Sequence, residues 1–250
     1  MRRARHLFHE VKWTPDAVRR FWDYHGAHAP AEDASFSRRF GARIIRLGLR
    51  GARVSGPVVD LGCGPGFLCE ALLREGYAVK ALDDSPASLE RVRALFAGEP
   101  RFLGAELADL RALPLGDREA GAVFLVEVLE HLPREAWDPL VAEVARVLRP
   151  GGRFVLTTPH EEDLAAHKVA CPECGAVFHR VQHLESVDAA SLRALLVRHG
   201  LRVRQLRATN FRHFPDRPFW GRLVARVMRA LSRLEARTAP HLVAVAERPR

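Results

Sequence analysis

Two carboxylates and an imidazole lie within five residues of one another in the segment Glu127-x-x-Glu130-His131. Carboxylates and imidazoles are the side chains that most often accept or deliver a proton in catalysis. Together they also bind divalent cations, which can acidify a bound hydroxyl. The segment therefore predicts either proton transfer or a metal site.

A second group of potential ligands lies in residues 160–187, where C-P-x-C-G is followed by two histidines at C-x2-C-x4-H-x3-H spacing. The proline and glycine bend the backbone so that two thiolates converge on one ion, and two imidazoles complete a tetrahedral zinc site. This segment has few apolar residues, so zinc binding would supply its folding energy. The predicted zinc ligands are Cys171, Cys174, His179 and His183. His160 and His167 are rival ligands, and a metal-free thiol pair is the alternative.

Glycines dominate the stretch that follows the apolar residues Val58 to Leu61. Residues 58–61 predict a buried parallel strand, and residues 67–75 predict a helix with one apolar face. The glycines between them permit a tight turn and close approach of the backbone to a ligand at the helix N-terminus. The spacing is G-x-G-x-G directly after D-L, and so differs from the dinucleotide pattern G-x-G-x-x-G. A nucleotide site of another kind is indicated.

The string D-L-G-C-G-P-G, residues 60–66, closely resembles motif I of the class I S-adenosylmethionine (SAM)-dependent methyltransferases. The stretch R-V-L-R-P-G-G-R-F-V-L-T-T-P, residues 146–159, is also common in that class. The resemblance covers residues 57–207 well and the two ends poorly. It implies an enzyme that binds SAM, with a domain for NAD or another nucleotide as the alternative.

Further carboxylates fit a SAM site by position. Asp83 ends a predicted strand about twenty residues beyond the glycines, where an acid can accept both ribose hydroxyls of an adenosine. Asp109-Leu110 resembles the family's adenine-binding D-A-x-x-L-P segment. The resemblance implies a SAM site formed by Asp60, Gly62, Cys63, Gly64, Gly66, Asp83, Asp84, Asp109, Leu110 and Val126.

Strands and helices alternate along the chain, which predicts a parallel, doubly wound sheet. The expected strands are 58–61, 77–83, 102–106, 122–126, 153–158, 201–206 and 241–247. The expected helices are 15–25, 35–50, 67–75, 85–97, 134–148 and 188–199. The resemblance implies the Rossmann-like α/β class I methyltransferase fold, with seven mostly parallel strands and an antiparallel last strand. We expect an N-terminal helical cover region (1–53) and a SAM-binding domain (54–250), with insertions at 160–187 and 210–239.

The E-x-x-E-H segment is similar to a metal-binding motif of small-RNA 3′-end 2′-O-methyltransferases and to a segment of ubiquinone-biosynthesis O-methyltransferases. In both families a later histidine joins the site, and His183 best matches it. We favour metal-free catalysis over a divalent metal at Glu127, Glu130 and His131. His183 cannot easily serve both as a zinc ligand and as a base. If it does not bind zinc, it is the preferred general base, followed by His131, with Glu130 as a third candidate catalytic residue.

These patterns favour methyl transfer from SAM to an oxygen, or less readily a nitrogen, of a small-molecule acceptor. A metal-dependent RNA methyltransferase and a catalytically inactive SAM-binding regulator are the alternatives. The net charge is +9, and the excess of arginine lies at both ends. A basic amphipathic helix expected within 210–239 could contact an anionic membrane, and nucleic acid is not favoured. Neither a membrane-spanning apolar run nor a signal peptide is expected, and the cytoplasm is the expected location.

Overall fold

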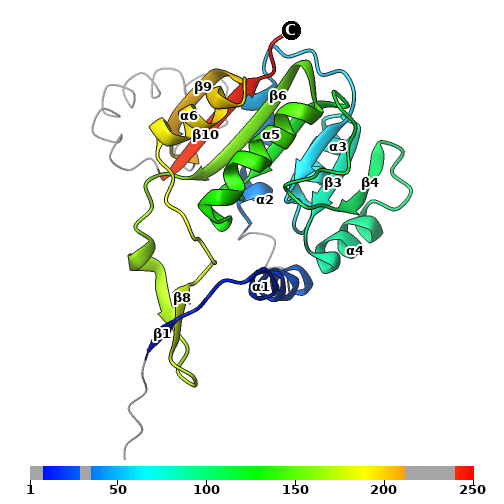
Figure 1. The fold of residues 1–250 in the computed structure, drawn as a ribbon. Helices are drawn as coiled ribbons and strands as arrows, with labels where there is room; N and C mark the ends of the chain where they lie inside the picture. Colours follow the sequence, from blue (N-terminus) through cyan, green and yellow to red (C-terminus); the bar gives the residue numbers. More distant parts are fainter. Residues whose placement is uncertain (1–7, 29–34, 212–239) are drawn as a thin grey trace, which may run out of the picture.

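A seven-stranded sheet forms the centre of the computed structural model, which describes residues 8–28, 35–211 and 240–250 (Figure 1). The strand order is β4-β3-β2-β5-β6-β10-β9, and β10 runs antiparallel to both of its neighbours. The strands are β2 (Val58–Leu61), β3 (Val79–Asp83), β4 (Phe102–Leu107), β5 (Ala120–Val126), β6 (Leu148–Pro159), β9 (Arg202–Thr209) and β10 (His241–Glu247). The predicted class I methyltransferase sheet, with its antiparallel last strand, is confirmed.

Helices cover both faces of this sheet. Ile44 of α2, Leu68 of α3 and Leu89 of α4 share one apolar core with the strands. Trp137 of α5 and Leu192 of α6 belong to the core on the opposite face. The helices are α1 (Pro15–Ala27), α2 (Phe36–Leu49), α3 (Phe67–Arg74), α4 (Pro86–Leu95), α5 (Trp137–Val147) and α6 (Ala189–Arg198). Since both faces are covered, the central strands can be apolar throughout, as β5 is.

Side-chain caps set three of the helix starts at the expected residues. Thr14, Ser85 and Asp188 each accept a hydrogen bond from a backbone N–H in the first turn of the helix that follows. The helix expected at 134–148 differs, because Arg134–Ala136 form a 3-10 turn and α5 begins only at Trp137.

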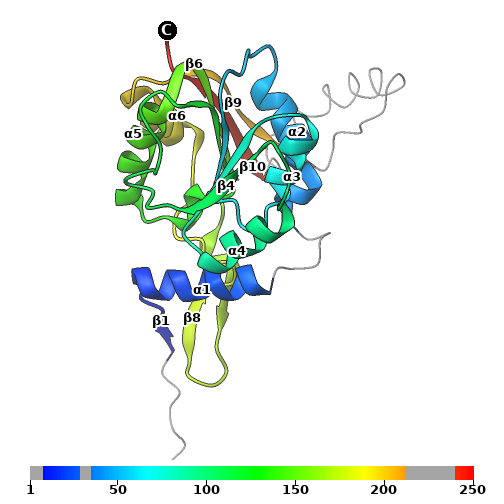
Figure 2. The same ribbon diagram turned by 90° about the vertical axis from the view of Figure 1, so that its right-hand side faces the viewer.

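Helix α1 lies across the edge of the sheet where the parallel strands end, and it packs against α4 (Figure 2). The hydroxyl of Ser85 donates to Asp23 at 2.8 Å, and Trp22 Nε1 donates to Gln182 Oε1 at 2.8 Å. Helix α2 instead packs on α3 and β6. Of the two expected N-terminal helices, α1 therefore covers the strand ends, whereas α2 is part of the core.

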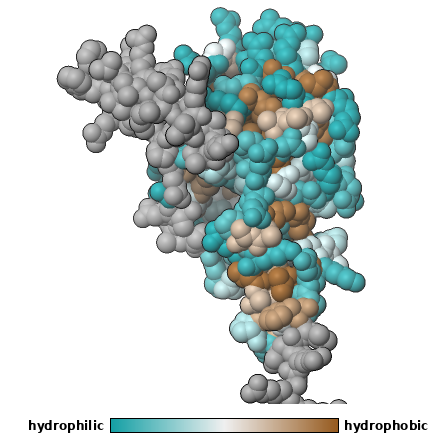
Figure 3. All heavy atoms as spheres, turned by 90° about the vertical axis from the view of Figure 1, so that its left-hand side faces the viewer, coloured by the Kyte–Doolittle hydropathy of each residue, from teal (hydrophilic) through white to brown (hydrophobic). Residues whose placement is uncertain are grey.

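The 160–187 insertion contains a small sheet that the sequence analysis did not predict. Strands β7 (Lys168–Ala170) and β8 (Ala176–His179) form a hairpin, and β1 (His9–Glu10) adds to β8 in parallel. Trp13 contacts Phe178 edge to face, with ring centroids 6.3 Å apart. Figure 3 shows hydrophobic residues gathered on the lower extension of the molecule, where this small sheet lies.

The second expected insertion falls largely outside the described residues. Of 210–239, only Asn210 and Phe211 are described, so the amphipathic helix expected there is not addressed by the structure. Phe211 is buried and packs on Phe36 and Phe40 of α2. None of the helices in the described ranges combines the length and the apolar character that a membrane span needs.

We predict that Gly48→Ala destabilises the protein through the contact between α2 and β6. A Cβ atom at Gly48 would lie 2.4 Å from Val155 Cγ2, and overpacking of this kind costs about 1–3 kcal/mol. Gly41→Ala in the same helix is the control, because its Cβ would meet Leu68 at an ordinary 3.4 Å. Urea unfolding measures both variants. Equal free energies of unfolding for the two would contradict this account of the packing.

Candidate active site

A cavity of about 540 Å³ lies at the carboxyl ends of β2, β3 and β5. Its walls are the glycine-rich loop after β2, the E-x-x-E-H segment after β5, the end of the 160–187 insertion, and α1. Apolar side chains dominate the wall that α1 supplies, among them Val18, Phe21 and Trp22. Ligands of open α/β sheets bind at this edge of the strands, so the cavity lies where the fold predicts a site.

Left-handed backbone at Gly62, Gly64 and Gly66 shapes the loop. Gly62 has a φ of 76°, and a Cβ atom there would lie 2.5 Å from Val128 Cγ2. A side chain at this position would be both strained and in collision with the opposite wall. The amide of Gly64 donates to Asp83 Oδ2 at 2.8 Å, which connects the loop to the end of β3.

The Asp83 carboxylate is almost fully buried and also accepts a hydrogen bond from the backbone N–H of Ser85 at 2.9 Å. Burial raises the pKa of Asp83 to about 6, although the two N–H donors favour its ionised form. Asp84 lines the cavity beside it, and burial raises its pKa as well. In the free protein Asp83 therefore changes charge at about pH 6.

Seven of the ten residues predicted to contact SAM line the cavity. They are Gly62, Cys63, Gly64, Asp83, Asp84, Leu110 and Val126.

The other three predicted SAM contacts are not among the lining residues. Asp60 is buried beneath the loop and accepts the thiol proton of Cys69 at 3.1 Å. Gly66 faces α4, since a Cβ there would meet Val92 at 3.0 Å. Asp109 lies at the surface, where its carboxylate binds Arg111 at 2.9 Å.

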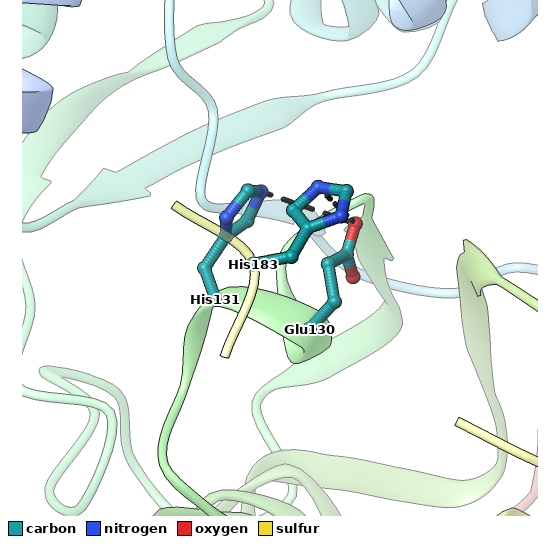
Figure 4. Close-up of side chains that lie close together, drawn as sticks. All are labelled: Glu130, His131 and His183. Carbon is teal, nitrogen blue, oxygen red and sulfur yellow. Dashed lines mark ion pairs between the residues drawn. The ribbon is translucent and has the colours of Figure 1, made fainter. Parts of the chain in front are cut away.

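Glu130, His131 and His183 come together at the cavity wall (Figure 4). The Nε2 atoms of His131 and His183 lie 3.9 and 4.0 Å from Glu130 Oε1. Glu130 is buried and accepts a hydrogen bond from the Thr158 hydroxyl at 2.9 Å, and burial together with nearby Glu127 raises its pKa. Burial and neighbouring His183 lower the pKa of His131 to about 3. The environment therefore favours the protonated form of Glu130, and His131 is uncharged at neutral pH.

Glu127 does not join this group. Its backbone is left-handed, with a φ of 54°, and its carboxylate lies 3.1 Å from His241 Nδ1 on β10. It still lines the cavity. Non-glycine residues in this conformation cost about 1–3 kcal/mol and cluster at functional sites.

Glu162 was missed by the sequence analysis, yet three histidines surround it. Its carboxylate contacts Nδ1 of His183, lies 3.4 Å from His179 Nε2 and lies 3.8 Å from His167 Nε2. Burial raises the pKa of Glu162, but the hydrogen bond with His183 and the nearby imidazoles outweigh it and lower the pKa overall. The only sequence signal was an acid shortly after a strand that ends at the cavity.

The four predicted zinc ligands do not form one group. Among the described residues, two groups of three or more potential ligands lie within 4.8 Å, and neither includes a cysteine. Strand pairing explains this, because Ala170 opposes Val177 and Lys168 opposes His179. The thiols are therefore at the hairpin tip, about 10 Å along the strand from His179. The predicted Cys2His2 site is not present in this geometry.

The rival zinc ligands are also separated from the thiols. His160 bridges to Val187 near the end of β6, and His167 lies beside Glu162 at the base of the hairpin. Backbone N–H groups of Cys174 and Glu173 lower the pKa of the Cys171 thiol at the exposed tip. The C-P-x-C-G turn thus favours a thiolate, but His160 and His167 lie away from it.

Gln182 was a second residue that the sequence analysis missed. It is fully buried with a φ of 60°, accepts from Trp22 Nε1 and donates to the carbonyl oxygen of His131 at 3.1 Å. It therefore connects α1 to the E-x-x-E-H segment. A polar residue between two histidines gives no sequence signal for such a role.

Comparison with known proteins agrees with this architecture. Residues 59–156 match the family model described as "Methyltransferase domain". The chain is 31% identical over 216 residues to the ubiquinone biosynthesis O-methyltransferase of Xylella fastidiosa, covering 82% of each chain.

Two solved structures share the fold. One is from the complex between the Haloferax volcanii Trm112 methyltransferase activator and a methyltransferase, with a TM-score of 0.64, 21% identity, and coverage of 92% of this chain and 98% of that one. The other is the Burkholderia thailandensis 1,6-didemethyltoxoflavin-N1-methyltransferase with bound S-adenosylhomocysteine. Its TM-score is 0.61 at 15% identity, with coverage of 97% and 93%.

The chain belongs to the class I SAM-dependent methyltransferases. It is an enzyme that transfers a methyl group from SAM to an oxygen of a small molecule. The comparisons give no support to the RNA methyltransferase or to the inactive regulator that the sequence left open.

We predict that the affinity for S-adenosylhomocysteine falls as the pH drops through about 6, the pKa of Asp83 in the free protein. Ribose hydroxyls donate to the ionised carboxylate, so binding favours that form and is lost as Asp83 becomes protonated. Calorimetric titration across this pH range tests it. Asp83→Asn should bind weakly at every pH. If the affinity of Asp83→Asn showed the same dependence on pH, an acid other than Asp83 would be responsible for that dependence.

Proposed function

We propose that the acceptor is a hydroxyl-bearing, largely apolar aromatic molecule of the kind that ubiquinone biosynthesis handles. The observation that carries this proposal is the wall opposite the glycine-rich loop, where Phe21, Trp22, Phe36 and Leu132 line the same cavity as the E-x-x-E-H segment. Flat aromatic side chains favour an aromatic guest by stacking and edge contacts. The related O-methyltransferase of Xylella fastidiosa supports the same class of acceptor.

His183 is the general base of this proposal. It lines the cavity, with Nδ1 against Glu162 and Nε2 on the side of Glu130. The pKa of His131, lowered to about 3, makes it a poor base at neutral pH, and the Nε2 of His183 is the remaining imidazole nitrogen beside Glu130. As the acceptor oxygen attacks the methyl carbon, its proton passes to His183 Nε2, the C–O bond forms and the C–S bond breaks. Neutral S-adenosylhomocysteine leaves.

A divalent metal is the second candidate, and the donor set fits one. Glu130, His131 and His183 each offer one ligand atom within 4.8 Å of the others. Oε1 of Glu130 is buried and has no hydrogen-bond partner in the described part of the chain. A cation bound by these three residues would lower the pKa of the acceptor hydroxyl. Glu127, which the sequence analysis had included among the ligands, lies outside this group.

We predict that the enzyme methylates alkyl-substituted catechols more efficiently than aliphatic alcohols of similar size. The aromatic wall buries apolar surface of both classes, but ring–ring contacts, worth about 0.5–1.5 kcal/mol per pair, form only with the first. Transfer of radiolabelled methyl groups from SAM, measured over a matched panel of both classes, gives the ratio of kcat/KM values. A preference for the aliphatic alcohols would reject the proposed acceptor and leave the methyltransferase assignment intact.

We predict that His183→Ala lowers kcat by about 10²–10⁴, the usual contribution of a general base, and leaves S-adenosylhomocysteine affinity unchanged. His160→Ala serves as the control, since His160 does not line the cavity. Full activity in His183→Ala, with loss of activity in His131→Ala, would assign the role of general base to His131.

Dialysis against a chelator distinguishes the metal-dependent mechanism from the metal-free one. Activity that disappears on dialysis and returns with Mg²⁺ requires a metal.

A further inference from the structure

We propose that Glu162 is a positioning residue that holds the proton of His183 on Nδ1, so that Nε2 faces the acceptor with a free electron pair. This inference rests on the proposed role of His183. Glu162 follows β6 and is brought to the cavity by the 160–187 insertion. It contacts the imidazole through the nitrogen that does not face Glu130.

The direction of this hydrogen bond follows from the chemistry of its partners. An ionised carboxylate only accepts, so the contact between Glu162 Oε2 and His183 Nδ1 requires the proton to be on Nδ1. The second nitrogen, Nε2, lies 4.0 Å from Glu130 Oε1, which is beyond hydrogen-bonding distance. A neutral His183 therefore presents a free electron pair at Nε2, on the cavity side of its ring.

His179 lies on the other side of Glu162, and its Nε2 makes no hydrogen bond of ordinary geometry in the described part of the chain. The backbone N–H of His183 donates to His179 Nδ1 at 3.1 Å, so this nitrogen carries no proton. The proton of a neutral His179 is then on Nε2, which lies 3.4 Å from Glu162 Oε1. His179 and His183 are stacked, with ring centroids 4.5 Å apart. His183 thus contributes its backbone amide and its ring to one closed set of contacts.

The backbone on either side of His183 is also fixed. Gln182 is bound to Trp22 and His131 through its side chain. The amides of Leu184 and Glu185 donate to the carbonyl oxygen of Glu130 at 2.8 and 3.2 Å. Since the backbone is held on both sides of His183, only the orientation of its ring can still vary. The contact with Glu162 fixes that orientation.

A metal bound by Glu162, His179 and His183 is the competing interpretation, because one atom of each lies within 4.8 Å of the others. The tautomer of His179 argues against it. With Nδ1 accepting the amide of His183, Nε2 carries the proton and has no electron pair for a cation. The geometry points to a hydrogen-bonded set that orients the base.

The test compares Glu162→Ala and Glu162→Gln with Glu161→Ala, a neighbouring exposed acid, in the full-length protein. We expect kcat to fall about 10- to 100-fold in Glu162→Ala, as for other carboxylates that orient a histidine, with unchanged S-adenosylhomocysteine affinity. Glu162→Gln keeps an acceptor for Nδ1–H and should recover part of the loss. Glu161→Ala should match the wild type.

Ring ¹⁵N chemical shifts of His183 give a readout that a structural role would not change. The wild type should show the Nδ1–H tautomer, and Glu162→Ala should show a larger share of Nε2–H. An Nε2–H tautomer in the wild type, or full kcat in Glu162→Ala, would overturn the inference. So would a bound divalent ion that Glu162→Ala releases. Normal activity of His183→Ala together with an inactive Glu162→Ala would reject His183 as the base. The tautomer measurement would then still decide whether Glu162 holds the proton of His183 on Nδ1.

Discussion

The arrangement of the site depends on the hydrogen bonds that Glu130 makes through its main chain and its side chain. Its carbonyl oxygen accepts the amides of Leu184 and Glu185, and its buried carboxylate accepts the hydroxyl of Thr158. One residue therefore joins the end of β5, the end of β6 and the insertion that delivers His183. A buried carboxylate is costly without partners, and the Thr158 hydroxyl offsets part of that cost at Oε2, whereas Oε1 has no hydrogen-bond partner among the described residues. Residues from different strands can meet in this way because the carboxyl ends of parallel strands lie at the same edge of the sheet.

The core of the fold was predictable because its signals are local. Apolar runs, caps at Thr14, Ser85 and Asp188, and the glycines after β2 each specify a nearby backbone conformation. The order of strand and helix then leaves few topologies open. For the same reason Gly62, Gly64 and Asp83, which follow directly from strand ends, line the cavity as expected of a ligand site. Asp109 is not among the lining residues, and its side chain binds Arg111 two residues away.

The insertion was less predictable because its organisation comes from long-range contacts. Strands β7 and β8 are three and four residues long, and β1 joins them from the other end of the chain. Spacing alone placed Cys171 and Cys174 with His179 and His183, but the hairpin register directs the thiols and the imidazoles to opposite ends. Glu162 and Gln182 meet partners that lie 21 and 160 residues away in the sequence.

The hairpin register also divides the thiols of the protein into two reactivity classes. Burial and the acids nearby raise the pKa values of Cys63 and Cys69, which lie at the glycine-rich loop. Cys171 lies partly exposed at the tip, with a lowered pKa, in the same turn as the exposed Cys174. Because thiolates rather than thiols react with alkylating agents and oxidants, the lowered pKa favours reaction at the hairpin tip over the buried thiols near the glycine-rich loop. The insertion thus separates the more readily ionised thiol of the chain from the cavity.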